Sequence, residues 1–458
     1  MPVFRAVAVH YRDAVPAVLQ ATRTVIRRAA RPETPARLRL WVAVAVGTAA
    51  ALLATTSLVM ARLQDQVRII GEVAAPQATI AADVYFALSD MDAQVARLVL
   101  IGDSDALAGS QVDALGTYQE RSRQVDTDIQ RSLGTATDAA DRAIVLDLLN
   151  QLAVYRQRVW QALTAGADAP GYYTQATNVM HLDLLPTAKR LRDASETRLD
   201  EAYAAKRVTE TAGTVLAILL GSALVIVLAG LQVWLARRFR RILNPALIAA
   251  TVLSVAVVVP AVTVLAVQGQ RLGTARDESL TPFLALSQAR AISYDAAADS
   301  SRYLISGNLA YYAQDFTAKT QCLTGGGSCG SGGESIAGGL AGVTGGPDVS
   351  PVQSAEVVSR WAGYQRDHER ITALAGAGRK AEAVDALTGI RRGDAAFDFS
   401  YYDAAAGRIA VARKAVFDKS VRETRSLLTG WAVIPVAGMA VVVLLILVSV
   451  RRRFAEYR

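Results

Sequence analysis

The sequence is poor in the residue types that most often carry catalysis and metal binding. Its 458 residues include three histidines and two cysteines, and aromatic residues make up 6%. It contains no nucleophile elbow, no dinucleotide-binding fingerprint and no metal-binding helix motif. We therefore predict that the chain is not an enzyme and that it has no catalytic residue, no metal site and no cofactor.

Charge is absent from four long stretches, although charged residues make up 20% of the chain. Each stretch exceeds the roughly 20 residues that a helix needs to cross about 30 Å of hydrocarbon. The predicted transmembrane helices are 40–60, 211–236, 245–268 and 427–450. Transporters and pumps usually carry ionisable groups within their spans, so the lack of such groups argues against a conducting protein.

Arginines are concentrated in the segments that lie on one side of a four-span chain. These are the N-terminal segment 1–39, the turn 237–244 and the tail 451–458. Together they carry about +13, whereas the whole chain carries +8. The positive-inside rule places all three in the cytoplasm, so we expect a multi-pass protein of the plasma membrane with both termini cytoplasmic. The arginines predicted to anchor the turn to membrane lipids are Arg237, Arg238, Arg240 and Arg241.

The basic charge of the chain does not indicate nucleic-acid binding. A basic patch on a soluble domain would suggest that partner. Here the excess of positive charge lies beside the predicted spans, and the two long loops between spans together carry a negative charge. The charge therefore indicates topology, and we expect no nucleic acid among the partners.

Two large polar regions, 61–210 and 269–426, lie outside the membrane in this arrangement. In the first, Gly102, Gly134 and Gly166 recur at intervals of 32 residues between stretches with helical spacing of apolar residues. That pattern predicts four helices of about 30 residues, as in a four-helix bundle. The second region contains a tract dominated by Gly and Ser at 324–347, which we expect to be a mobile loop.

The order of span, outer domain and span occurs twice, which suggests a tandem repeat. At an offset of 205 residues, Asp90, Arg97 and Gly102 correspond to Asp295, Arg302 and Gly307. The predicted fold class is an all-α membrane protein. It has four transmembrane helices and two extracytoplasmic domains of the four-helix-bundle type.

Cys322 and Cys329 are the only cysteines, and they lie at the start of the Gly-rich tract. Because the tract is predicted to be in an oxidising compartment, we expect a disulfide between them. Two free thiols or a metal pair are the alternatives, although a zinc site would need further ligands and only His181 and His368 lie on that side. We expect both histidines to pack within the bundles.

Arg97 and Arg302 are candidate binding residues for a partner or ligand. Each comes shortly before a helix-ending glycine, where a membrane-distal tip is expected, and a guanidinium can grip a carboxylate with two hydrogen bonds. The alternative is an ion pair within the bundle, with Asp90 and Asp295 seven residues earlier on the same helix face. We keep all four as candidates.

Two segments carry a resemblance to a known family. They are ADVYFALSDMDAQVARLVLIG at 82–102 and YYTQATNVMHLDLLPTAKRL at 172–191. With the predicted layout, the chain resembles the actinobacterial GlnX family of four-span membrane proteins. The resemblance implies an amino-acid sensing relay. Its partners would be a periplasmic solute-binding lipoprotein of the glutamine-binding type and a cytoplasmic serine/threonine kinase. It supplies no ligand residues.

The predicted function is therefore transmembrane signal transduction that reports extracytoplasmic amino-acid availability to a cytoplasmic kinase. The competing class is a scaffold that organises envelope partners without signalling, and an accessory subunit of a transporter is a third alternative. The sequence leaves open whether the protein is a homodimer, which ligand it detects and whether it binds that ligand directly.

Overall fold

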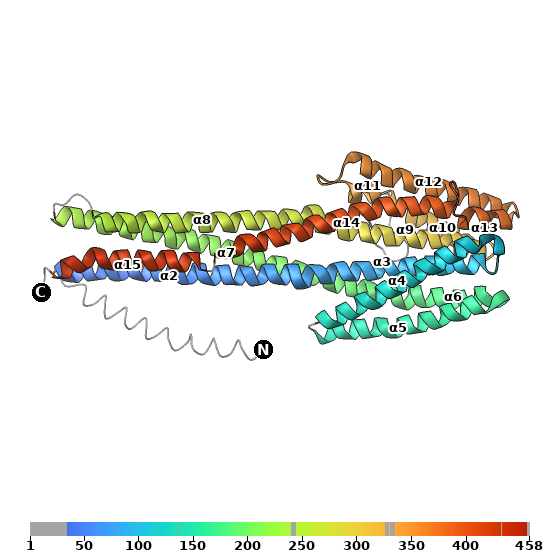
Figure 1. Ribbon diagram of the computed structural model, residues 1–458, viewed down its shortest axis with the longest axis horizontal. Coiled ribbons are helices and arrows are strands. Elements are labelled where there is room, and N and C mark those ends of the chain that lie inside the picture. Colours follow the sequence, from blue (N-terminus) through green and yellow to red (C-terminus); the bar gives the residue numbers. More distant parts are fainter. Residues whose placement is uncertain are drawn as a thin grey trace. The chain divides into compact units, whose positions relative to one another are not determined.

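The structure is a computed structural model that describes residues 34–136, 138–239, 244–325, 329, 335–431 and 433–455. Every regular element in these ranges is helical, in line with the predicted class (Figure 1). The longer helices of the N-terminal half are α2 (Thr34–Ile69), α3 (Ala75–Ile101), α4 (Ala108–Thr135), α5 (Ala139–Thr164), α6 (Ala169–Val179) and α7 (Leu185–Phe239). Those of the C-terminal half are α8 (Pro245–Ala275), α9 (Thr281–Ile305), α10 (Ala310–Leu323), α11 (Gly339–Thr344), α12 (Pro351–Gly376), α13 (Lys380–Thr388), α14 (Ala395–Leu428) and α15 (Ile434–Ala455).

The chain forms two compact units, each built from segments distant in sequence. Unit 1 comprises the described residues within 1–67, 205–270 and 424–458, and unit 2 those within 68–204 and 271–423. Unit 1 contains the predicted spans, whereas unit 2 contains most of both predicted outer domains. The expectation of two separate outer domains therefore needs correction, because their helices form a single unit.

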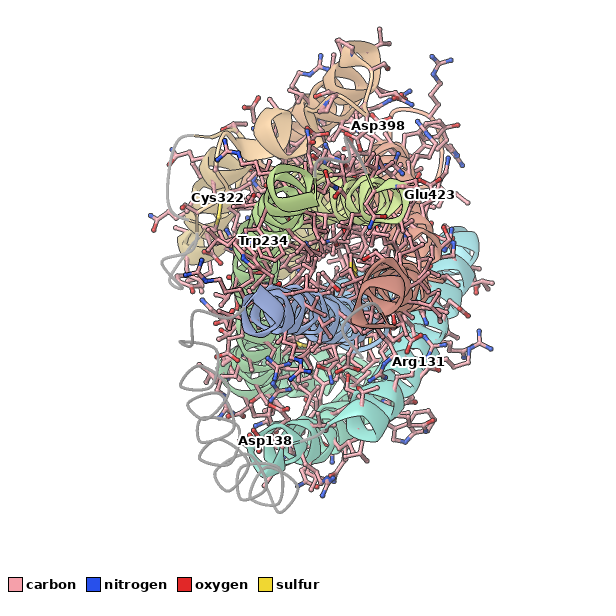
Figure 2. The ribbon with its side chains drawn as sticks, turned by 90° about the vertical axis from the view of Figure 1, so that its left-hand side faces the viewer. Arg131, Asp138, Trp234, Cys322, Asp398 and Glu423 are labelled. Atoms are coloured by element: carbon pink, nitrogen blue, oxygen red, sulfur yellow. A yellow bond between two sulfur atoms is a disulfide. The ribbon has the colours of Figure 1, made fainter. Side chains whose placement is uncertain are left out.

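Unit 1 is held together by close helix packing around an aliphatic core. The core includes Leu52, Leu224, Leu228 and Ile446, and Trp234, which Figure 2 labels, packs against it. Glycines allow the helices to approach: a Cβ on Gly213 would lie 2.4 Å from Val59 Cγ1, and equivalent tight contacts occur at Gly221 and Gly438. Small residues at such contacts are typical of helices that associate in lipid, where the hydrophobic effect gives no drive for association.

Within the described ranges, three helical stretches are long and apolar enough to cross a membrane. They are Arg37–Ile101, Gly166–Arg237 and Pro245–Ile305, each with a strongly apolar window. The fourth predicted span differs from expectation, because the helix is interrupted within it. α14 ends at Leu428, Gly430 adopts a φ of +90°, and the apolar helix that follows, Ile434–Ser449, is shorter.

The predicted basic turn is described in part. Asn244 accepts a hydrogen bond from the amide of Ala246 through its side-chain oxygen, and Pro245 is the first residue of α8. This is the expected N-cap followed by proline at the first helical position. Arg237 is exposed near the end of α7, whereas Arg240, Arg241 and the side chain of Arg238 lie outside what the structure describes, as does most of the segment 1–39.

The glycine spacing correctly predicted the breaks between the first helices of unit 2. Gly102 follows α3 with a φ of +54°, and Gly166 follows α5 with a φ of +57°. Both conformations are left-handed and therefore favour glycine. Gly134 lies in the last turn of α4. In the second half, Gly307 follows α9 with a φ of +74°, which matches the position of Gly102 after α3.

Three prolines within long helical stretches follow wide turns rather than breaks. Pro76, Pro186 and Pro282 each come two residues after a five-residue π-helical segment: Ile70–Ala74, Met180–Leu184 and Arg276–Leu280. The amide just before each proline donates to the carbonyl five residues back. Proline removes a helical hydrogen bond and its ring crowds the carbonyl four residues earlier, and the wide turn makes room for it. The helical path therefore continues past each proline.

The two predicted outer domains meet along α3 and α9, which lie side by side (Figure 1). The ring of Phe86 on α3 meets that of Tyr294 on α9 edge to face, with centroids 5.4 Å apart. Tyr294 in turn meets Phe399 of α14 at 4.8 Å. The guanidinium of Arg290 lies 4.2 Å from the Phe86 centroid and pairs with Asp403. Apolar and charged contacts thus join the two halves of unit 2.

The C-terminal part of the Gly-rich tract is folded, contrary to the prediction of a mobile loop over 324–347. Residues 339–344 form α11, and Leu340 and Val343 are buried. Arg413, itself fully buried, donates hydrogen bonds to the carbonyls of Val343 and Gly345. A guanidinium satisfies several carbonyls at once, which fixes the end of this short helix. Residues 326–328 and 330–334 of the tract lie outside the described ranges.

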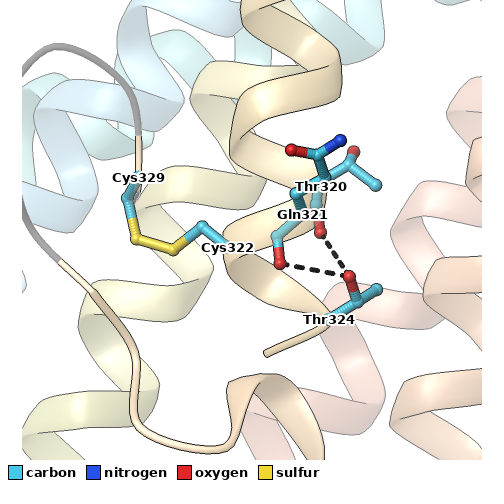
Figure 3. Close-up of a disulfide and its surroundings, with 5 residues drawn as sticks. All are labelled: Thr320, Gln321, Cys322, Thr324 and Cys329. Carbon is cyan, nitrogen blue, oxygen red and sulfur yellow. Dashed lines mark hydrogen bonds between the residues drawn. A yellow bond between two sulfur atoms is a disulfide. The ribbon is translucent and has the colours of Figure 1, made fainter. Parts of the chain in front are cut away.

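The predicted Cys322–Cys329 pairing is present in the structure (Figures 2 and 3). Their Cα atoms are 5.0 Å apart, which lies within the usual range for a disulfide. Cys322 is buried in the last turn of α10, and the hydroxyl of Thr324 donates to the carbonyls of Thr320 and Gln321 beside it (Figure 3). The bridge therefore begins at a helix end that is already ordered.

The folded end of the tract predicts opposite effects for two glycine substitutions. Gly339 has a φ of +58°, and a Cβ there would lie 2.5 Å from Gly325 N and Leu323 O. Gly339→Ala should cost at least about 2 kcal/mol. Gly116 is exposed within α4 with nothing near its missing Cβ, so Gly116→Ala should stabilise by up to about 1 kcal/mol. Thermal midpoints in detergent test this, and an unchanged midpoint for Gly339→Ala would contradict the packing described for α11.

Candidate functional site

A buried guanidinium, that of Arg302, lies at the centre of a polar network in unit 2. Its side chain is 4% exposed. Nη2 donates to Asp92 of α3 at 2.5 Å, and Nη1 donates to Asp299 at 2.6 Å and Asp295 at 2.9 Å. A guanidinium suits this position because it has five N–H donors in a fixed plane.

The first half of unit 2 converges on Asp92, whose side chain is 2% exposed. Tyr155 of α5 donates its hydroxyl to one carboxylate oxygen at 3.3 Å, and Thr177 of α6 donates to the other at 3.1 Å. Burial disfavours the charged form, but Arg302 and His181 outweigh it and lower the pKa of Asp92. Asp92 is therefore an ionised anchor for Arg302.

Lys319 of α10 supplies the second buried cation. Its Nζ lies 2.5 Å from Asp299, 2.7 Å from Asp295 and 2.8 Å from Asp315. Burial opposes its charge, but the surrounding carboxylates hold the pKa of Lys319 above its usual value. Burial and the neighbouring Asp295 raise the pKa of Asp299 to about 6. Asp299 therefore takes up a proton more readily than Asp92 and Asp295, because the pKa values of those two carboxyls are lowered.

His181 completes the cluster from the segment between α6 and α7. Its Nε2 lies 2.8 Å from Arg302 Nη2 and 3.4 Å from Asp295 Oδ1. Across the described residues, no group of three or more His, Cys, Asp or Glu is arranged to hold a metal ion. The carboxylates instead meet Arg302 and Lys319, which makes the network a connection between helices of both halves of unit 2.

The structure separates the four candidate residues that the sequence singled out. The alternative reading of Arg302 fits the geometry, since it pairs with Asp295 and is too buried to be reached by a docking partner. Asp90 does not pair with Arg97. It is buried, accepts from Arg121 Nε at 2.6 Å and from Gln94, and burial raises its pKa despite Arg121.

Arg97 lies in a different environment from Arg302. Its Nη1 donates to Asp113 of α4 at 2.8 Å and its Nη2 to the carbonyl of Thr388 in α13 at 3.0 Å. The side chain is 13% exposed and lines a cavity of about 190 Å³. Of the four candidates it is the one that borders this cavity. The repeated arginines therefore serve different purposes: Arg302 connects buried helices, and Arg97 borders an open space.

His368 packs within the bundle, as the sequence suggested. Its ring stacks on Phe316 with centroids 3.5 Å apart, and Nδ1 lies 2.8 Å from the Ser300 hydroxyl. Burial lowers the pKa of His368 to about 4, so the ring is neutral at physiological pH. Tyr364 also donates to Ser300.

Sequence reasoning missed Asp92, Asp299 and Lys319 as members of the network. A partial signal was available, because Asp295, Asp299 and Arg302 are spaced by four and three residues and so share one helix face. No comparable spacing points to Asp92 or Lys319. They lie on other helices, and only the packing of α3, α9 and α10 brings them to Arg302.

The fold and the site define a helical protein with apolar helices long enough to cross a membrane and a polar helical unit joined by buried ion pairs. Residues 66–204 match the family model of an actinobacterial sensor domain, and this similarity supports a role in sensing or signalling. The matched segment contains Asp92, Arg97 and His181. No curated protein and no solved structure matches the chain.

Removing the central cation should destabilise unit 2 strongly. Arg302→Met leaves Asp92 buried without its main partner and leaves Asp299 with Lys319 alone, and breaking such a buried pair costs about 3–5 kcal/mol. We expect the thermal midpoint in detergent to fall by roughly 10 °C or more. Arg123→Met is the control, because the side chain of Arg123 is 74% exposed and its pair with Glu120 is worth little. Equal midpoints for the two variants would contradict the network's structural role.

Asp83 of α3 gives a prediction for pH dependence. Burial raises the pKa of its carboxyl to about 6, although Lys414 lowers it. A carboxyl with a raised folded pKa costs stability above that pKa, and the cost disappears as pH falls below its unfolded value near 4. Asp83→Asn should therefore raise the thermal midpoint at pH 7.5, by an amount corresponding to about 1–3 kcal/mol. The difference from the unmodified chain should vanish near pH 4, and a gain that is the same at both values would rule out titration of Asp83.

Proposed function

We propose that the protein is a transmembrane sensor that relays extracytoplasmic amino-acid availability to the cytoplasm. The observation that carries this proposal is the match of residues 66–204 to a sensor domain, within a unit whose two halves are joined by the Arg302 network. Four helices, α2, α7, α8 and α14, each contribute residues to both units. A change in unit 2 can thus reach unit 1 through continuous helices.

The topology that we propose has four spans, with unit 2 outside and both termini in the cytoplasm of the plasma membrane. The arginine distribution supports this orientation. The fourth span would be α15, whose apolar part is short but packs Val442 and Ile446 into the core of unit 1. A π-helical segment, a proline, an arginine and a glycine occur in the same order along α3 and along α9, which supports an origin by tandem duplication.

The partners that we propose follow from the resemblance to the GlnX family. A periplasmic solute-binding lipoprotein of the glutamine-binding type would deliver the signal, and a cytoplasmic serine/threonine kinase would receive it. The chain itself would be a relay without enzymatic activity. A scaffold or transporter-accessory protein is the competing proposal, and it predicts partners without a response to amino acids.

Phosphorylation in the native host tests the relay. A strain lacking the gene receives a pulse of glutamine after starvation, and phosphorylation of kinase substrates is followed by mass spectrometry. We expect the response to be lost in the deletion strain and restored by the unmodified chain. Gly116→Ala serves as a matched variant that should restore it too, since Gly116 is exposed and has no neighbour near its missing Cβ. A full response in the deletion strain would overturn the relay, and the scaffold would then be the remaining proposal.

A further inference from the structure

The cavity beside Arg97 is formed by helices from both halves of unit 2. α3 and α4 line it from one half, and α9, α12, α13 and α14 line it from the other. Its volume of about 190 Å³ corresponds to roughly six water molecules at their share of liquid volume. Asp113, which is 57% exposed, borders it, so the cavity is accessible from solvent. A small molecule bound there would contact both halves at once.

Two residues that line this cavity, Arg97 and Gln94, each have one buried side-chain atom without a hydrogen-bond partner in the protein. These atoms are Nε of Arg97, a donor, and Oε1 of Gln94, an acceptor. The rest of each side chain is fixed, since Gln94 Nε2 donates to Asp90 and the two Nη atoms of Arg97 donate to Asp113 and Thr388. Leaving such atoms unpaired costs about 1–3 kcal/mol each. A ligand acceptor at Arg97 Nε and a ligand donor at Gln94 Oε1 would remove this cost, once small side-chain movements open the two atoms to the cavity.

The charge of the cavity favours a ligand with no net charge. Arg97 and Asp113 form a pair at 2.8 Å, and the neighbouring Asp90 is matched by Arg121. A simple anion would leave a negative charge without compensation, and a simple cation would leave a positive one. A zwitterion can place its carboxylate on Arg97 and its ammonium group on Gln94 and Asp113, so that both charges are matched.

Aromatic rings form the opposite wall. Tyr294 and Tyr364 each meet Phe399, with centroids 4.8 Å and 5.1 Å apart. All three line the cavity, and Ser301 and Ser400 lie among them. Such a wall accepts aliphatic groups and attracts an ammonium group to the ring faces. Ligand sites commonly combine an apolar wall with a few fixed polar groups in this way.

A second, wider cleft of about 790 Å³ lies between α4 and the α12–α13 region. Three of its charged residues already have partners: Glu382 pairs with Arg379, Asp394 accepts from the amide of Arg391, and Arg370 donates to the carbonyl of Gly393. No aromatic residue lines it. The smaller cavity is therefore the better binding site.

We propose that the cavity between α3 and α9 binds a small α-amino acid directly, with Arg97 gripping its carboxylate and Gln94 and Asp113 holding its ammonium group. This inference deepens the proposed sensing function and rests on it for its biological meaning. Binding would join α3 and α4 to α9 and α14, and so favour one arrangement of the two halves. The protein would then detect its signal itself, in addition to any solute-binding partner.

Calorimetry on the full-length protein in detergent tests the binding. The probes are glycine, L-alanine, L-glutamine and L-aspartate, with propionate and propylamine as analogues that each lack one charged group. We expect saturable binding of at least one amino acid at up to millimolar concentration, and binding at least about tenfold weaker for both analogues. The absence of saturable binding by all four amino acids, or equal binding of propionate, would overturn the proposal.

Variants locate the binding in the cavity. Arg97→Gln should weaken it at least about tenfold, whereas Arg123→Gln, 74% exposed on α4 and absent from the cavity lining, should leave it unchanged. If Arg97→Gln lowers the thermal midpoint, Ala297→Leu gives a second test, since it fills the cavity without removing a charge. Unchanged binding in a folded Arg97→Gln or Ala297→Leu protein would overturn the assignment.

The outcomes separate this proposal from the relay. Absence of binding together with a glutamine response that depends on the gene would refute the cavity and leave a relay that works through a partner. If Arg97→Gln loses amino-acid binding but the deletion strain responds normally to glutamine, the binding site in the cavity is supported and the relay is refuted. Loss of both binding and response in Arg97→Gln cells would support both.

Discussion

The buried charge of Arg302 is the constraint on which unit 2 depends. A guanidinium with 4% exposure is tolerated only where carboxylates surround it, and here they come from α3 and α9. Replacing such a cluster by apolar residues can be neutral for stability, so its value lies in specifying one arrangement of the helices. Asp92 can reach Arg302 only when α3 and α9 are in this register. The ion pair therefore decides how the two halves meet.

The other features of unit 2 are consistent with that register. Edge-to-face contacts from Phe86 through Tyr294 to Phe399 continue the connection with apolar groups. The π-helical segments before Pro76 and Pro282 add a wide turn at the same place in both halves. The cavity at Arg97 also lies between α3 and α9, and two of its lining residues, Gln94 and Arg97, each have an unpaired polar atom. The two halves of unit 2 are thus held together by ion pairs at Arg302, whereas a cavity separates them at Arg97.

Unit 1 is held together by close apolar packing of helices rather than by buried ion pairs between helices. Its helices carry few polar side chains, and Gly213, Gly221 and Gly438 let backbones approach closely. Polar contacts occur singly, as between Gln232 and Thr251. Packing of this kind depends on shape rather than charge. In the described part of unit 1, the buried Lys206–Glu210 pair lies within one helix, α7, so it does not oppose small shifts between helices. That property suits a unit that must respond to changes elsewhere in the chain.

Periodicity and composition by themselves determined the helical class, the apolar segments, the breaks at Gly102 and Gly166 and the cysteine pairing, because each depends on residues close in sequence. They also offered the Arg302–Asp295 pair, two turns apart on one helix, as one of two interpretations of Arg302, and the structure contains it. Only the tertiary structure decided that the two outer regions form one unit and that α11 is folded by Arg413. It also decided that Arg302 is buried while Arg97 borders a cavity. Similar local sequences cannot distinguish those two arginines, because the groups that surround each come from helices far away in the chain.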